Sequence, residues 1–159
     1  MLPRSCPGRE VRPGLGIGGR GPARSVLLAA RGAPEHARRV ALDPESRTTN
    51  ALTQILFAEL WGTRPEFEIV AGDLEAALRE HDAVVRIGDK ALFERLPAGV
   101  GAVDLGQQWD RATGLPFVYA VWACRAGVLD DELCDALHES LRRGASAIDS
   151  IASDYAWKG

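Results

Sequence analysis

The chain has 159 residues, a length typical of one domain with its own hydrophobic core. Hydrophobic residues make up 46% and charged residues 26%, which is the composition of a globular protein. A formal net charge of −3 excludes a broad basic surface, so nucleic acid is not an expected partner.

Membrane, secretion and metal signals are weak in this sequence. No apolar run approaches the roughly 18 residues of a transmembrane helix, and the first residues lack the apolar core of a secretory signal. The cysteines, Cys6, Cys124 and Cys134, are odd in number and irregularly spaced, which favours neither disulfides nor a zinc site. We therefore expect a cytoplasmic protein with reduced thiols, no metal and no membrane partner.

Residues 1–23 contain many glycines and prolines and few apolar anchors, so we expect them to be irregular. From there to residue 124, strand-like apolar runs alternate with amphipathic helical stretches. The expected strands are residues 24–31, 40–43, 67–71, 82–87, 103–105 and 116–124. The expected helices between them are residues 48–61, 74–81, 90–96 and 107–113. This alternation predicts an α/β fold with a mostly parallel sheet covered by helices.

The last part of the chain reads as two helices, over about residues 130–143 and 146–155. The expected organisation is thus an irregular segment 1–23, an α/β lobe 24–125 and a helical segment 126–159.

Two strand-to-helix turns are candidate ligand sites. The first gathers hydroxyl and amide side chains at Ser46, Thr48, Thr49 and Asn50. Such side chains either cap the helix or join its unpaired N–H groups around a carboxylate or phosphate, and the pattern leaves both readings open. The second is Gly88-Asp89, where glycine allows a close backbone approach and the aspartate caps the helix or accepts a ligand hydroxyl. Neither turn has the glycines and lysine of a P-loop.

Two further features concern single residues. His36, His81 and His138 lie far apart and are flanked by charge, so we expect all three at the surface. Arg86 interrupts the apolar strand 82–87, where a buried charge needs a partner or a route to solvent.

Four stretches taken together carry a family resemblance. They are GIGGRGPARSVLLAAR, VALDPESRTTNALTQILFAELWG, DAVVRIGDKALF and VDLGQQWDRATGLPFVYAVWACR. In this order, over about residues 15–155, they resemble the menaquinone-biosynthesis family of the futalosine pathway, and within it the chorismate dehydratases of the MqnA type. The resemblance implies a cytoplasmic enzyme with a type II periplasmic-binding-protein-like fold of two α/β lobes.

The same resemblance implies an activity. A hydro-lyase of this type removes water from chorismate and gives 3-(1-carboxyvinyloxy)benzoate, with no metal or organic cofactor. The substrate would lie at the two helix starts, on Ser46, Thr48, Thr49, Asn50, Gly88 and Asp89. No catalytic residue follows, because the substrate's own enolpyruvyl carboxylate is one proposed proton acceptor.

Two alternatives remain open. A 1,4-dihydroxy-6-naphthoate synthase of the same pathway shares the fold, but in that enzyme a His-Glu pair stands where this chain has Gly88-Asp89. A solute-binding protein of the same fold would hold a small anion without chemistry.

Compared with the family, the chain is short, and we expect the first lobe to be largely missing. Residues 24–31 and 116–124 would cross between lobes, and the helices after residue 126 would pack on the other lobe. Their apolar surface would then be exposed, which favours association into a homo-oligomer.

Overall fold

The computed structural model describes residues 8–128 and 130–156. The chain forms two compact units, one made of Ile17–Ala120 and the other of the residues on either side of it. Among the described residues, no helix is both long and apolar enough to cross a membrane.

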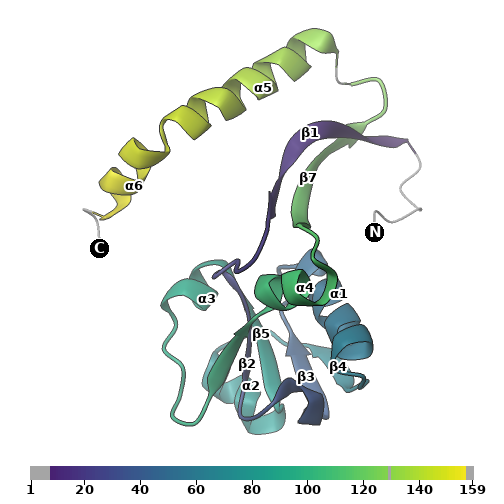
Figure 1. Cartoon of the computed structure of the whole chain (residues 1–159), viewed down its shortest axis with the longest axis vertical. Coiled ribbons are helices and arrows are strands. Elements are labelled where there is room, and N and C mark those ends of the chain that lie inside the picture. Colours follow the sequence, from purple (N-terminus) through teal and green to yellow (C-terminus); the bar gives the residue numbers. More distant parts are fainter. Residues whose placement is uncertain (1–7, 129, 157–159) are drawn as a thin grey trace. The chain divides into compact units, whose positions relative to one another are not determined.

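The unit Ile17–Ala120 is built on a five-stranded sheet in the order β4-β3-β5-β2-β6 (Figure 1). β3 pairs in parallel with β4 and β5, whereas β2 is antiparallel to β5 and β6. All the other strands therefore run opposite to β2. The strands are β2 (Val26–Ala30), β3 (Arg39–Leu42), β4 (Glu66–Ile69), β5 (Ala83–Ile87) and β6 (Gly101–Asp104).

The α/β fold is confirmed, but the sheet is mixed rather than mostly parallel. The link from β2 to β3 is short and contains only one 3-10 turn, η1 (Pro34–His36). A parallel connection within a sheet needs a dozen or more residues, usually an α-helix, to return the chain to its starting edge. The short link therefore makes β3 run opposite to β2.

Helices cover both faces of this sheet. They are α1 (Arg47–Ile55), the π-helical η2 (Leu56–Leu60), α2 (Leu74–Glu80), α3 (Gly88–Phe93) and α4 (Leu105–Thr113). α1, η2 and α4 bury side chains such as Phe57 against the face that carries Leu28. α2 buries Leu78 against the opposite face, which carries Ala29. Because successive strand residues point to opposite faces, β2 contributes to both cores.

The partner that Arg86 was expected to need is present. Arg86 Nε donates to Glu94 Oε2 at 2.8 Å, and Nη2 donates to the Gly72 carbonyl at 3.2 Å. Glu94 Oε1 also accepts the Leu74 N–H at 3.3 Å. The Arg86 side chain is only 4% exposed and that of Glu94 is 27% exposed. The pair therefore joins β5 to the residue after α3 and to the start of α2, with the guanidinium almost out of water.

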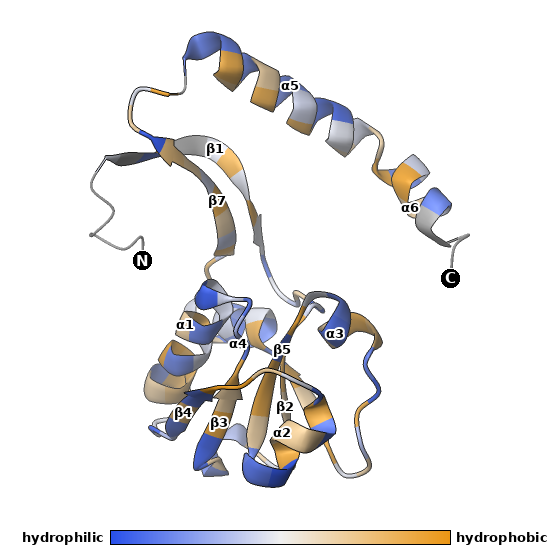
Figure 2. Ribbon diagram, turned by 180° about the vertical axis from the view of Figure 1, so that it is seen from behind, coloured by the Kyte–Doolittle hydropathy of each residue, from blue (hydrophilic) through white to orange (hydrophobic). Residues whose placement is uncertain are grey.

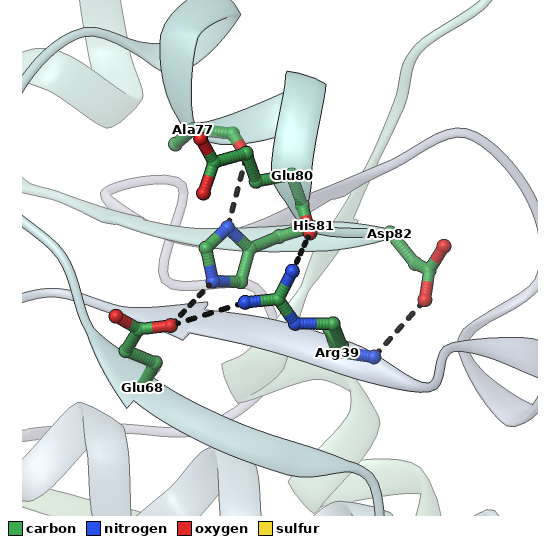
Figure 3. Close-up of polar contacts among 6 residues, drawn as sticks. All are labelled: Arg39, Glu68, Ala77, Glu80, His81 and Asp82. Atoms are coloured by element: carbon green, nitrogen blue, oxygen red, sulfur yellow. Dashed lines mark hydrogen bonds and ion pairs between the residues drawn. The ribbon is translucent and has the colours of Figure 1, made fainter.

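His81 is buried, which corrects the expectation that all three histidines lie at the surface; the other two are exposed. Its Nδ1 lies 3.0 Å from the Ala77 carbonyl and its Nε2 lies 3.3 Å from Glu68 Oε2 (Figure 3). Glu68 also pairs with Arg39 at 3.3 Å. The ring tolerates burial because both nitrogens reach polar partners, and charged sequence neighbours do not reveal this.

Asp82, next to His81, holds the chain that enters β3. Its Oδ2 accepts the backbone N–H groups of Arg38 at 2.8 Å and of Arg39 at 3.0 Å (Figure 3 shows the second). The hydrogen bond from Arg38, followed by that from Arg39, lowers the pKa of this carboxyl.

Residues 1–23 were expected to be irregular, and the strand β1 (Arg9–Gly19) corrects this; residues 1–7 lie outside the described part. β1 pairs with β7 (Phe117–Arg125), and both strands contribute residues to both units. At Gly18, an added Cβ would lie 3.1 Å from the Phe117 carbonyl oxygen. Pairing with a distant segment, not local propensity, makes this strand.

The helices α5 (Asp131–Ser146) and α6 (Ile148–Ala156) follow β7. Hydrophobic residues recur among hydrophilic ones along α5 (Figure 2). Apolar side chains on both helices are exposed, among them Leu133, Leu141, Ile148 and Ile151.

The first prediction concerns the buried ion pair. Glu94→Gln leaves the Arg86 charge buried without its counter-ion, so we expect a loss of about 3 kcal/mol in the free energy of unfolding, measured by urea denaturation. Glu66→Gln, at an exposed position, is the matched control and should change little. Equal stability of both variants would show that Arg86 does not depend on Glu94.

The second prediction concerns acid stability. Because its pKa is lowered on folding, the Asp82 carboxylate stabilises the fold above its unfolded pKa of about 3.9, and this contribution is lost as pH falls through the lower folded value. Asp82→Asn should therefore cost more stability at pH 7 than at pH 3 in urea denaturation. Asp89→Asn, also exposed, is the control; a cost independent of pH at Asp82 would contradict the assignment.

Candidate functional site

A cavity of about 420 Å³ lies where β3 and β5 end, entirely within the unit Ile17–Ala120. Four segments line it: the end of β1 with the loop into β2, the start of α1, the start of α3, and β7. The described lining contains no charged side chain. Its polar side chains are all hydroxyls, those of Ser25, Ser46, Thr48, Thr49 and Tyr119.

The first predicted turn lies in this cavity. Ser46 is the N-cap of α1, and its Oγ accepts the Thr49 N–H at 3.1 Å and donates to Thr49 Oγ1 at 2.8 Å. Thr48 lines the cavity, and its hydroxyl forms no hydrogen bond with any described residue. Capping at Ser46 is thus confirmed, and the Thr48 hydroxyl is available to a ligand.

Asn50 and Asp89 do not line the cavity within the described part of the chain. The Asn50 amide forms two hydrogen bonds with the backbone of Asp43, the residue after β3. Its Oδ1 accepts the Asp43 N–H at 3.1 Å, and its Nδ2 donates to the Asp43 carbonyl at 2.7 Å. Asp89 is exposed, and no side chain caps α3, whose N-cap is Ile87. The geometry gives Asn50 a structural contact and leaves Asp89 in solvent.

Gly88 lines the cavity, and the close approach to a ligand that glycine would allow here stays a prediction. Its φ of 58° lies in the left-handed region, which favours glycine. A Cβ added here would meet no atom of the described residues within 4 Å, so no close contact within the protein requires glycine. Its N–H donates to the Ser25 carbonyl at 2.9 Å, which joins the start of α3 to the loop that forms another wall.

Asp104 organises the site, although the sequence did not single it out. Its Oδ1 accepts the N–H groups of Ala23 at 3.0 Å and Gln107 at 2.9 Å, and its Oδ2 accepts that of Arg24 at 2.6 Å. It thereby caps α4 and holds the cavity-lining loop before β2. An aspartate just before LGQQW is the N-cap signal that could have found it.

Tyr119 is the second site residue that sequence reasoning missed. Its ring packs edge-on against Phe117, with centroids 4.8 Å apart. Burial, and then the nearby Asp104 charge, raise the pKa of its phenol above the ordinary value. A Cβ at Gly106 would collide with the Tyr119 hydroxyl oxygen and lie 2.9 Å from the Gly21 carbonyl oxygen. The glycine after Asp104-Leu105 therefore makes room for Tyr119 and the loop.

The sequence matches a protein-family model described as menaquinone biosynthesis over residues 8–158. The chain belongs to the menaquinone biosynthesis family. The family resemblance seen in the sequence is thereby confirmed.

Two curated relatives are chorismate dehydratases. The protein from Thermus thermophilus is 37% identical over 145 residues, which cover 80% of this chain and 53% of the relative. The protein from Campylobacter jejuni is 34% identical over 84 residues, covering 53% of this chain and 27% of the relative. This chain thus spans about half the length of the first relative.

A crystal structure of an Archaeoglobus fulgidus protein is similar in fold, with a TM-score of 0.60 over 96% of this chain and 57% of that one. The sequence identity of 19% limits this likeness to the fold.

The third prediction tests the packing at Gly106. Gly106→Ala should lower the free energy of unfolding by about 1–3 kcal/mol because the methyl group overpacks the site. The loss should be smaller in a Tyr119→Phe background, where the colliding hydroxyl is gone; urea denaturation of the four proteins measures the coupling.

Gly144→Ala is the matched control. Gly144 lies in α5 with open space around its added Cβ, so alanine should stabilise there by about 0.5–1 kcal/mol. Equal losses for Gly106→Ala in both backgrounds would mean that Tyr119 does not occupy this space.

Proposed function

We propose that this chain belongs to a chorismate dehydratase, a hydro-lyase that converts chorismate to 3-(1-carboxyvinyloxy)benzoate in menaquinone biosynthesis. The observation that carries the proposal is the 37% identity to the Thermus thermophilus chorismate dehydratase along most of this chain. The five-stranded unit would be one lobe of a type II periplasmic-binding-protein-like fold.

The cavity suits such a substrate. Chorismate carries two carboxylates, and the first turn of α1 offers unpaired N–H groups, a partial positive charge and the Thr48 hydroxyl. Thr49 Oγ1 accepts from Ser46, so its own proton is left to donate. One carboxylate would rest at this helix start, and neutral donors would hold it without a fixed cation.

The proposed elimination requires the protein mainly to orient the substrate. Loss of water makes the ring aromatic, which drives the elimination, and the substrate's enolpyruvyl carboxylate would take the ring proton. The protein's part is then to hold one conformation of the substrate and to exclude solvent around it.

Turnover is the direct test. The chain is incubated with chorismate, and chromatography follows chorismate loss and the benzoate product. Saturable chorismate binding with no product would favour an anion-binding protein, and product only from the naphthoate synthase substrate would favour that enzyme instead.

The fourth prediction concerns the proposed carboxylate site at the start of α1. Thr48→Val together with Thr49→Val removes two hydroxyl donors, so the Kd for chorismate should rise about 10–100-fold, measured by equilibrium dialysis.

Thr53→Val is the matched control, because Thr53 lies one turn further along α1 and donates to the Thr49 carbonyl at 2.8 Å. It should affect stability but leave the Kd unchanged. An unchanged Kd in the double variant would show that neither hydroxyl binds chorismate.

A further inference from the structure

The hydroxyl of Tyr119 differs from the other polar groups of the cavity. The four other side-chain donors are aliphatic alcohols of serine and threonine, and Tyr119 supplies the phenol. A phenol, with an ordinary pKa near 10, is a far stronger acid than an alcohol. Among the described residues, none forms a hydrogen bond with the Tyr119 hydroxyl, so its proton is not committed to the fold.

The fold holds this hydroxyl in place from several sides. The strand β7 carries the residue, the Phe117 ring packs on its ring, and Gly106 leaves the space that its oxygen occupies. The Asp104 carboxylate fixes both α4, which carries Gly106, and the loop at Ala23.

The surroundings also keep the phenol protonated. A phenol is neutral at neutral pH even at its ordinary pKa, and burial, followed by the negative charge of Asp104, raises the pKa of Tyr119 further. A phenolate would repel a substrate that carries two carboxylates, and this arrangement avoids it.

Expulsion of a hydroxyl needs a proton, because hydroxide is a poor leaving group. We propose that Tyr119 is the general acid of the elimination and gives its phenol proton to the departing hydroxyl of the substrate. This proposal rests on the proposed dehydratase function.

The step balances within the substrate and one residue. The C–O bond breaks as the phenol proton forms an O–H bond, and water leaves. The C–H electron pair becomes the new ring double bond, and the substrate's carboxylate accepts that proton. Transfer of the proton from the carboxylic acid back to the phenolate restores Tyr119, so no oxidant, reductant or metal takes part.

Tyr119→Phe is the decisive variant, because it deletes one oxygen and keeps the ring. We expect kcat for chorismate to fall about 100–10,000-fold, with little change in KM and in melting temperature. The chain has only two tyrosines, and Tyr155→Phe, in α6, is the matched control that should retain full activity.

A fluorinated tyrosine separates proton donation from packing. It is incorporated in the Tyr155→Phe background, so that position 119 alone carries the more acidic phenol. The loss of kcat on the alkaline side should then begin at a lower pH than with ordinary tyrosine, and Tyr119→Phe should lack this limb. If Tyr119 had only a structural role, fluorination would not shift the pH at which kcat falls.

The outcomes are distinguishable. A parent chain that turns over chorismate, with Tyr119→Phe equally active, overturns the role of Tyr119 and leaves the dehydratase function standing. The role of Tyr119 is also overturned if Tyr119→Phe loses much of its kcat but fluorination does not shift the pH at which kcat falls on the alkaline side. A parent chain that binds chorismate without turnover sinks the dehydratase function, and the proton-donor role with it.

Discussion

One carboxylate, that of Asp104, joins the parts of the candidate site. It collects three backbone N–H groups from two segments, the loop at Ala23-Arg24 and the first turn of α4. Hydrogen bonds to a charged acceptor contribute about 1.5–3 kcal/mol each, which is enough to offset the roughly 1–3 kcal/mol of strain at Arg24, whose φ is 60°. The loop can therefore hold a shape that its sequence alone would not favour.

A second set of polar contacts fixes the opposite wall. The Asn50 side chain spans the backbone of Asp43, and Asp43 Oδ1 accepts the Glu45 N–H at 2.8 Å. Together with the Ser46 cap, these bonds hold the turn from β3 into α1 before any ligand arrives. Pre-ordered donors cost less entropy when a ligand binds, so the polar residues of this turn act as support as well as lining.

The sequence predicted what depends on local periodicity. The strand 82–87 and the helix 74–81 appear within a residue or two of their expected bounds, and the buried charge at Arg86 has the partner that its setting required. Of the candidate site, the hydroxyls of the α1 turn were found because a helix start has a composition signal.

What the sequence did not predict depends on distant partners. β1 is a strand because β7 lies beside it, and His81 is buried because Ala77 and Glu68 meet its ring. Tyr119 is a site residue only through Gly106 and the loop before β2, which no local pattern links to it. Such relations need the tertiary structure.

The reversed direction of β2 explains why the site lies at the end of the sheet where β3 and β5 finish. Ligand sites in α/β sheets form where parallel strands end and helices begin, which accounts for the α1 and α3 walls. Because β2 runs the other way, its first residue, Val26, lies opposite Ile87, the last residue of β5. The chain that precedes β2 therefore arrives at the same edge, and Asp104, at the end of β6, anchors it there. An all-parallel sheet would have carried this loop to the far edge, away from the helix starts.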